Sequence, residues 1–592
     1  MKNLVYVVFV AVLTVAGFSN TVAQTVVNVP SDNPPQEGNL NNAVQAAITA
    51  GRLSSTTFRL EPYGYYVLTG TINVPAGQTL TIEAPAPGTT QATAPPQIVW
   101  TASGGVNTQF NFNVFGNITL RNVWIRYANT AGTQVGSSLQ FQYDSLAIGG
   151  QYGNFEGVIF DYSPCPPNAG GAVGITTKKF NGTFKNCYFK NIIDNHLRYY
   201  GRALSFPYQT TGWGSSSVIF EHCTFANIGY VYMQEGGQYS DYVKFNHCTF
   251  LNVVMFPLQS GWWNKLAVTN SLFINTWMFG NNPSQTGTGD PNGGTLRIDS
   301  VATFGFSVPF TDQGRRILFA NSAYFLDTWL TNWMQNNPYS VTLRQQRRDD
   351  EIPIPHPMLS PNTRRFFDST LTSGQKAFPY INRANLYDRT QNPGFVNPPM
   401  DTTLVKDFLW RKWFDNSQVN WAWKPDNDWM GLWPLAENLS YSNTTLRTAS
   451  LGKFPLGDLY RWWPTQYTSW KAQEAAENQR ITSWLETGKD PLATSVERIV
   501  DSAIPSDFQL SQNYPNPFNP TTRIEYSIPL TGRVSLRVYN SLGQEVTVLF
   551  DGMQSVGKYV ATFDGAGLPS GVYFYRLQSG VVTLTQKLVL MK

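Results

Sequence analysis

The chain has 592 residues, a formal net charge of +4 and only 14% charged residues. This charge balance does not resemble the basic footprint of a nucleic-acid-binding protein, so we expect no nucleic-acid partner. Glycine, asparagine, threonine and aromatic residues are abundant, and that composition favours an all-β protein of several domains over a helical one.

Residues 1–24 have the pattern of a secretory signal peptide. Lys2 precedes the apolar run LVYVVFVAVLTVAGF, and small residues for cleavage follow at Thr21–Ala23. A membrane anchor is the alternative, but the run is short and no stop-transfer flank follows it. No later segment is long and apolar enough to span a bilayer. We therefore expect export across the inner membrane and a mature chain without a transmembrane segment.

Residues 25–325 repeat a short unit in which two strands flank a polar turn residue. FEHCTF, from Phe220, and FNHCTF, from Phe245, are two copies. Side chains alternate along a strand, so Phe220 and Cys223 are predicted to point inward and Glu221 outward. The small or apolar residue after the turn recurs at Val123, Val158, Cys187, Cys223, Cys248, Ser271 and Ala323. Because no helical segment separates the strands, the pattern predicts stacked β-coils.

This coil pattern resembles the right-handed parallel β-helix of the pectate-lyase-like superfamily over about residues 60–325. An Asn or Asp often follows the aromatic residue of a unit, at Asn191, Asn227, Asn252, Asn275 and Asp327. Solenoids need capped ends, and the segment Asn39–Gly51 places Val44, Ala47 and Ile48 on one helical face. We therefore assign residues 25–325 to an all-β, right-handed parallel β-helix with an N-terminal helical cap.

Two of the repeats contain adjacent His-Cys pairs, His222-Cys223 and His247-Cys248. Both residue types bind zinc, but neighbouring residues of a strand face opposite ways. The histidines also occupy a turn position that other units fill with Asn, Gly or Ser. We interpret both pairs as structural ladder positions and predict no metal site there. The cysteines are expected to be packed thiols with at most one disulfide; they are Cys165, Cys187, Cys223 and Cys248.

Residues 326–487 are rich in Trp and Pro, as in WAWKPDNDWMGLWPL. We interpret them as a C-terminal cap and flank wrapped on the solenoid, with aromatic residues used for packing rather than for ligand stacking. The segment Asn392–Pro399 resembles a chain that leaves a β-helix, and Thr468–Glu486 has the pattern of an amphipathic helix. Residues 488–503 are a predicted linker.

Residues 504–592 alternate short strands with Gly, Pro and Ser turns, which is typical of a small immunoglobulin-like β-sandwich. Their motifs are Asn513–Pro520 (NYPNPFNP), Tyr539–Gln544 (YNSLGQ), Leu568–Tyr573 (LPSGVY) and the basic end Lys587–Lys592. Together these motifs closely resemble the C-terminal sorting domain of type IX secretion cargo, which is found in Bacteroidetes and their relatives. An ordinary immunoglobulin-like spacer is the alternative.

A sorting domain implies that the type IX secretion machinery recognises the chain. It also implies export across the outer membrane, followed by release or attachment at the cell surface. Unrelated cargoes carry such domains, so the resemblance predicts where the protein goes and not what it does there.

The strand after each asparagine position is expected to form a sheet along the solenoid. Enzymes of the superfamily act on acidic polysaccharides at such a sheet, and their lyases use a basic residue and often Ca²⁺. Hydrolases need paired carboxylates, and no Asp pair appears on these strands. For a lyase, the catalytic candidates are Arg202, Arg198, Asp194 and Glu235, with Ca²⁺ as the implied cofactor.

Amide side chains and flat aromatic rings on the same strands suit hydrogen bonding to, and stacking on, sugars. The substrate-binding candidates are Gln234, Gln259, Trp262, Trp263 and Asn281. Roles in surface turns and loop packing are the alternative for all of these residues. Because the strands carry few carboxylates, we expect a protein that binds extracellular polysaccharide in an adhesive or envelope-structural role, without a cofactor. A polysaccharide lyase that acts by β-elimination is the alternative, so enzymatic activity is left open.

Overall fold

The computed structural model describes residues 24–33, 35–101, 110–129, 138–143, 149–161, 171–193, 201–206, 214–234, 238–259, 262–280, 294–305, 307–414, 421, 423, 431–491, 496–499, 505–566 and 568–592. The chain divides into two compact units. The first contains Met1–Phe378 and Arg383–Lys471, and the second contains Pro379–Asn382 and Ala472–Lys592.

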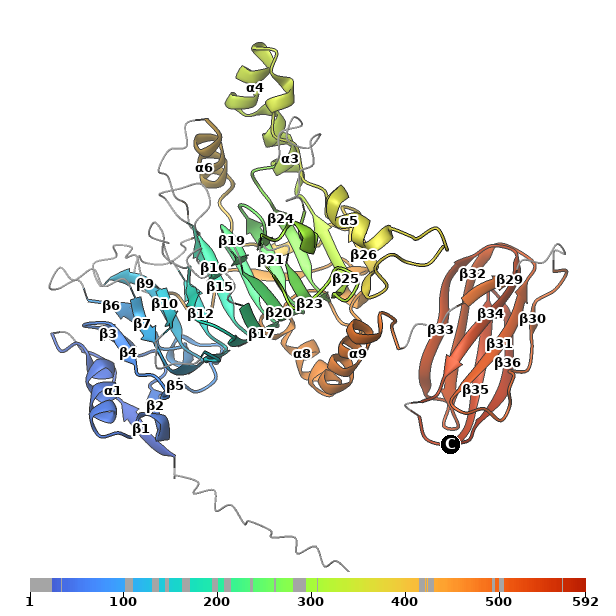
Figure 1. Cartoon of the computed structure of the whole chain (residues 1–592), viewed down its shortest axis with the longest axis horizontal. Helices are drawn as coiled ribbons and strands as arrows, with labels where there is room; N and C mark the ends of the chain where they lie inside the picture. The colour runs from blue at the N-terminus through green and yellow to red at the C-terminus, as the bar shows by residue number, and fades with distance from the viewer. Residues whose placement is uncertain are drawn as a thin grey trace, which may run out of the picture. The chain divides into compact units, whose positions relative to one another are not determined.

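The first unit is a parallel β-helix, as predicted, with the strands of successive coils stacked side by side (Figure 1). The strands of its 19-stranded sheet fall into two sets, here called the first and second faces, which meet at the corner of each coil. The first face contains β1 (Thr25–Val29), β2 (Thr56–Leu60), β5 (Thr79–Glu83), β8 (Asn117–Arg121), β11 (Tyr152–Glu156), β14 (Phe180–Lys185), β17 (Gly214–Glu221), β20 (Tyr239–Asn246) and β23 (Trp263–Thr269). The second face contains β3 (Tyr65–Leu68), β6 (Gln97–Trp100), β9 (Trp124–Asn129), β12 (Ile159–Asp161), β15 (Tyr188–Ile192), β18 (Thr224–Ile228), β21 (Thr249–Val253) and β24 (Leu272–Thr276).

A separate seven-stranded sheet forms the third side of the coils between β2 and β22 (Leu258–Gln259). It contains β4 (Ile72–Val74), β7 (Phe110–Val114), β10 (Ser138–Gln142), β13 (Val173–Thr176), β16 (Arg202–Phe206), β19 (Tyr230–Gln234) and β22. In the last coil, the long strand β25 (Arg316–Phe325) pairs in parallel with both β23 and β24.

Like residues stack on one another inside the solenoid. The rings of Phe184, Phe220 and Phe245 lie face to face, with centroids 4.6 and 4.7 Å apart. Phe225 and Phe250 form a second column at 5.1 Å. All five side chains are fully buried, and each contributes about 1.5–3 kcal/mol of hydrophobic free energy. The predicted period-two alternation is therefore confirmed for these coils.

The last coil differs from the prediction by one residue. Strand register pairs Leu272 with Ala323, so Ser271 aligns with Ser322, whose hydroxyl accepts the Ser271 N–H at 3.3 Å. Asn321, with a φ of 49°, therefore forms the corner. The assignment of Ala323 to the inward ladder was wrong because asparagine tolerates the left-handed corner conformation better than serine does.

Two columns of left-handed residues form the corners of the coils. The first column, between the two faces, has φ values of 49–65° at Asn122, Gly157, Asn186, His222, His247, Asn270 and Asn321. The second follows the second face, with φ values of 51–56° at Asn191, Asn227, Asn252 and Asn275. In this second column, Asn252 Nδ2 donates to Asn227 Oδ1 at 3.0 Å and Asn275 Nδ2 donates to Asn252 Oδ1 at 3.1 Å. The side chains that mark the repeat in the sequence thus form a hydrogen-bonded ladder.

Helix α1 (Asn39–Thr49) buries Leu40, Val44 and Ala47 at the N-terminal end of the solenoid. Ile48, predicted on the same face, is only partly buried. The helix begins after Gly38, which has a φ of 88° and whose Cβ, if present, would lie 2.8 Å from Thr69 Oγ1. Glycine is the residue that fits this left-handed, closely approached position.

Residues 326–430 add helices and two strands to the end of the β-helix. They form α3 (Thr328–Asn336), α4 (Pro338–Gln345), α5 (Pro361–Asp368), β26 (Ile381–Asp388), β27 (Phe395–Asn397) and α6 (Thr402–Phe414). Residues 431–471, here called the strap, form β28 (Asn438–Tyr441), α7 (Leu459–Trp462) and α8 (Pro464–Lys471). The helix predicted over 468–486 is two helices, α8 and α9 (Glu474–Thr487), because Gln473 has a φ of −111° that interrupts the run.

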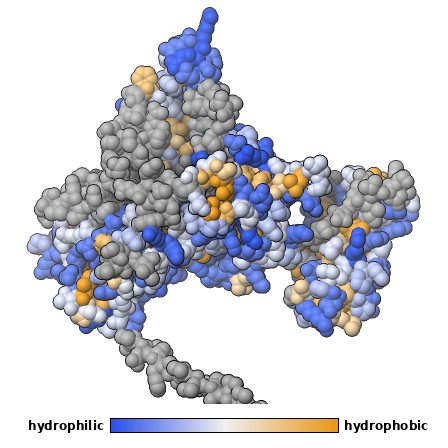
Figure 2. All heavy atoms as spheres, viewed as in Figure 1, coloured by the Kyte–Doolittle hydropathy of each residue, from blue (hydrophilic) through white to orange (hydrophobic). Residues whose placement is uncertain are grey.

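The strap covers the outer side of the second face. Outward residues of successive coils share one buried cluster with the strap: Trp124, Ile159, Tyr188, Ala226, Leu251, Leu439, Tyr441, Leu456, Leu459, Trp462 and Trp470. A buried ion pair joins Lys190 Nζ to Glu437 Oε1 at 3.0 Å. The aromatic residues of the strap therefore pack against the β-helix. The surface of the first unit seen in Figure 2 is mostly hydrophilic, with small separate hydrophobic patches.

The strap also places a carboxyl group inside this cluster. Asp458 is fully buried and caps α7, with its Oδ1 accepting the Arg461 N–H at 3.1 Å. Its Oδ2 accepts the hydroxyl of Thr224, on β18, at 2.7 Å. Burial raises the pKa of Asp458 from 3.8 to about 7, although the positive charge of Arg461 opposes that shift.

We predict that Asp458 makes the first unit less stable as the pH rises from about 4 to 7. The folded state holds the Asp458 proton to a higher pH than the unfolded chain does, so ionisation costs stability across this window. The variant Asp458→Asn should match the wild type at pH 4 and exceed its stability by roughly 2–4 kcal/mol at pH 7.5. Denaturant titrations at both pH values measure the difference, and a difference independent of pH would contradict this assignment.

The second unit contains α9 and a β-sandwich of two four-stranded sheets. The sandwich was predicted, but residues 496–499, within the predicted linker 488–503, form one of its strands by pairing with residues 558–561. One sheet contains β29 (Val496–Ile499), β30 (Gln509–Leu510), β31 (Thr521–Ile528) and β34 (Gly557–Asp564). The other contains β32 (Gly532–Asn540), β33 (Glu545–Gln554), β35 (Gly571–Ser579) and β36 (Val582–Leu590). Inward residues of both sheets, such as Ile524, Leu536, Val538 and Tyr575, form its own core.

Candidate functional site

The strands that follow the asparagine corner do form a sheet, as predicted. β16, β19 and β22 are neighbours in the seven-stranded sheet. Register aligns a row of mostly polar residues across it, Asn73, Asn113, Gln140, Gly174, Ser205, Met233 and Gln259. In the middle of the row Gln140 is only 3% exposed and Ser205 is fully buried. This row shares only Gln259 with the predicted site residues, and its central residues are not at the surface.

Among the predicted catalytic residues, the structure describes Arg202. Its side chain is 2% exposed, and Nη1 donates to Ser205 Oγ at 2.9 Å. Arg198, Asp194 and Glu235 lie outside the described residues. The catalytic role assigned to these four residues therefore stays a prediction.

The predicted sugar-binding residues lie in different surroundings. Gln234 is enclosed within the solenoid, where its Nε2 donates to Ser240 Oγ at 2.8 Å. Trp263 is fully buried, and its ring packs 5.2 Å from that of Tyr232. The ring of Trp262 is partly exposed and lies 4.7 Å from that of Phe304.

The other two predicted binding residues are Gln259 and Asn281. Gln259 ends β22 and is in register with Met233 of β19. Asn281 lies outside the described residues. The sugar-binding role assigned to these residues therefore stays a prediction.

The two His-Cys pairs belong to the corner and interior columns. The rings of His222 and His247 stack with centroids 5.0 Å apart, and the ring of Trp470, from α8, lies 4.1 Å from that of His222. Burial first, and then the neighbouring His247, hold the pKa of His222 well below its usual value, so this imidazole is neutral at physiological pH.

The cysteines face the interior. Cys187, Cys223 and Cys248 are buried free thiols, and Cys165 lies outside the described residues. Within the described part of the chain, no three His, Cys, Asp or Glu residues group closely enough to hold a metal ion.

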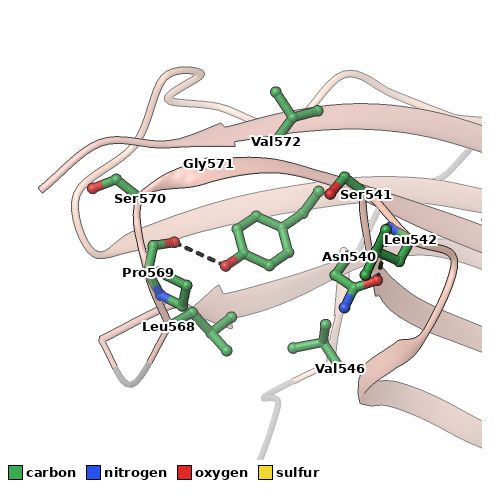
Figure 3. Close-up of a pocket in the computed structure, with 10 residues that line it drawn as sticks. Asn540, Ser541, Leu542, Val546, Leu568, Pro569, Ser570, Gly571 and Val572 are labelled. Carbon is green, nitrogen blue, oxygen red and sulfur yellow. Dashed lines mark hydrogen bonds between the residues drawn. The ribbon is translucent and has the colours of Figure 1, made fainter.

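The β-sandwich carries a pocket of about 330 Å³ between two of its turns (Figure 3). Its lining residues are Asn540, Ser541, Leu542, Val546, Leu568, Pro569, Ser570, Gly571, Val572 and Tyr573. Two of the quoted sequence motifs, YNSLGQ and LPSGVY, supply nine of these ten residues. Strands β32 and β35 bring the motifs together by pairing Asn540 with Tyr573. The sequence offered both motifs but no direct indication that they meet.

Hydrogen bonds fix the two sides of this pocket. The Tyr573 hydroxyl donates to the Pro569 carbonyl at 2.8 Å, and the Leu542 N–H donates to Asn540 Oδ1 at 3.0 Å (Figure 3). Leu542 is nonetheless 81% exposed and Val572 is 41% exposed. Exposed apolar side chains around a rigid pocket are a feature of protein-binding surfaces.

Residues 512–591 match the family model described as "Secretion system C-terminal sorting domain". No curated protein and no solved structure matches the chain. In the described part of the chain, no helix has both the length and the apolar character needed to cross a membrane. The matched range covers the pocket, the strands β31–β36 of the sandwich and the motifs quoted from this region except the last residue, Lys592. The chain therefore carries a type IX secretion C-terminal sorting domain and is a cargo protein exported to the cell surface or the extracellular space.

Proposed function

We propose that this exported protein binds extracellular polysaccharide in an adhesive or envelope-structural role. The observation that supports the proposal is a rigid solenoid that repeats rows of hydroxyl and amide side chains at a fixed strand spacing. Such rows match the hydrogen-bonding groups of a polymer that is itself a repeat of hydroxyl-bearing units. Delivery by the sorting domain places these rows where extracellular glycans occur.

Binding and lyase activity are separated by one experiment on the purified full chain. We expect retention on a glycan array and no rise in ultraviolet absorbance when polyuronates are added, with or without Ca²⁺. A rise in absorbance from unsaturated products would instead support the lyase, with Arg202 or Arg198 as its base and Asp194 and Glu235 near Ca²⁺. Absence of both retention and product would contradict the proposed function.

We further propose that the type IX machinery contacts the sorting domain at the pocket between Asn540 and Tyr573. The support is the convergence of two family-typical motifs on one site with exposed Leu542 and Val572. Neither side chain is needed for the sandwich core, because both are exposed. Contact with the machinery would remove these two apolar side chains from water.

A further inference from the structure

The outer side of the first face carries a ladder of alternating charges. Strand register aligns Arg59, Glu83, Arg121, Glu156, Lys185 and Glu221 on six successive strands. Neighbours form ion pairs, with nitrogen–oxygen distances of 2.7 Å for Arg59–Glu83, 3.5 Å for Arg121–Glu83 and 3.4 Å for Lys185–Glu221. Each charge has an opposite neighbour, so the row neutralises itself.

Two uncharged polar rows run beside this charge ladder. One contains Thr81, Thr119, Asn154 and Thr183, and the other contains Thr79, Asn117, Tyr152 and Asn181. Side chains within the rows contact one another, since Thr79 Oγ1 lies 3.2 Å from the Tyr152 hydroxyl. Asn154 is exposed, and Thr81, Thr183 and Tyr152 are partly exposed. The result is a flat surface that offers hydroxyl, amide and phenol groups.

The other two sides of the solenoid are less accessible. The strap covers the second face, where Trp124, Ile159 and Tyr188 are buried. On the seven-stranded sheet, Gln140 and Ser205 of the outward row are also buried. Thr119, on β8, is buried and interrupts the first polar row of the first face. The second row, Thr79, Asn117, Tyr152 and Asn181, is partly exposed on four neighbouring coils. Among the described residues, the first face is thus the side on which a polar row stays accessible from coil to coil.

We propose that the first face, at β5, β8, β11 and β14, binds an uncharged linear polysaccharide lying along the solenoid axis. Its rows repeat at about 4.8 Å, the spacing of neighbouring strands, and so present similar groups to successive sugar units. Tyr152 adds a flat ring on which a pyranose can stack. An acidic polysaccharide would gain little binding free energy here, because each of its carboxylates would compete with Glu83 or Glu156 for a guanidinium group that is already paired.

This inference rests on the proposed polysaccharide binding and identifies its surface and ligand class. The test is affinity electrophoresis of the full chain in gels containing hydroxyethylcellulose, dextran or polygalacturonate. We expect retardation by hydroxyethylcellulose or dextran that persists in 0.5 M NaCl, since salt screens only charge-based binding. In the triple variant Thr81→Ala, Asn154→Ala, Thr183→Ala, we expect the dissociation constant to rise at least about tenfold.

The matched control is the double variant Asn336→Ala, Thr342→Ala, which removes an exposed asparagine and an exposed threonine of the first unit outside the first face and should bind as the wild type does. Loss of retardation in this control but not in the triple variant would overturn the first-face site and leave polysaccharide binding intact. Retardation by polygalacturonate alone would overturn the uncharged ligand class. Absence of retardation in all three gels would overturn both the surface and the proposed function.

Discussion

Deletion of residues 504–592 is expected to leave the protein in the periplasm. Export across the outer membrane depends on the sorting domain, which family comparison places at residues 512–591. The β-helix keeps its own buried cluster, separate from the core of the sandwich, so the truncated chain should still fold. Cell fractionation, together with protease treatment of intact cells, measures the surface-accessible fraction, which should fall to background. Surface delivery of the truncated chain at the wild-type level would refute this dependence.

A point variant tests the pocket within the intact sorting domain. Leu542→Asp adds a charge at a side chain that is 81% exposed, so it disturbs docking more than folding. Leu530→Asp is the matched control, because Leu530 is 70% exposed on the same domain but does not line the pocket. We expect reduced surface delivery for Leu542→Asp and normal delivery for Leu530→Asp. Equal delivery of both variants would exclude the pocket as a contact of the machinery.

The β-helix could be predicted because its determinants are local. A left-handed corner at Asn186 or Asn270, with alternating side chains on either side, is set by a few neighbouring residues. The sequence also indicated that residues 326–487 wrap on the solenoid, but it did not indicate which face the strap covers. Thr224 and its partner Asp458 are separated by 234 positions in the sequence, and outward apolar residues such as Tyr188 gave no sign of what covers them.

The candidate sites also depend on long-range contacts that neighbouring residues do not indicate. The polar character of Gln234 suggested an outward, sugar-binding position, but the interior of the solenoid holds its own polar cluster. There, the Tyr232 hydroxyl lies 2.7 Å from Ser240 Oγ, which also accepts a hydrogen bond from Gln234. The pocket required two motifs to meet through the pairing of β32 with β35, a long-range contact that neither motif specifies.

Substitution of Asn252 is expected to destabilise the first unit strongly. Asn252 is fully buried and has a φ of 54°. Its side chain both donates to Asn227 and accepts from Asn275. Asn252→Ala loses the favourable left-handed residue, which costs about 1 kcal/mol, and deprives two buried amides of a partner, at about 1–3 kcal/mol each. The free energy of unfolding should fall by roughly 3–5 kcal/mol, as measured by denaturant titration of the full chain.

Two further variants separate the causes of this loss. Asn252→Gly accepts a positive φ but makes no side-chain hydrogen bond, so it should be about 1 kcal/mol more stable than Asn252→Ala. Asn154→Ala removes an exposed asparagine from the first face and should change stability by less than about 0.5 kcal/mol. If Asn252→Gly were as stable as the wild type, backbone conformation alone would explain the asparagine column. If Asn252→Ala were equally stable, the hydrogen-bonded ladder would have no part in holding neighbouring coils together.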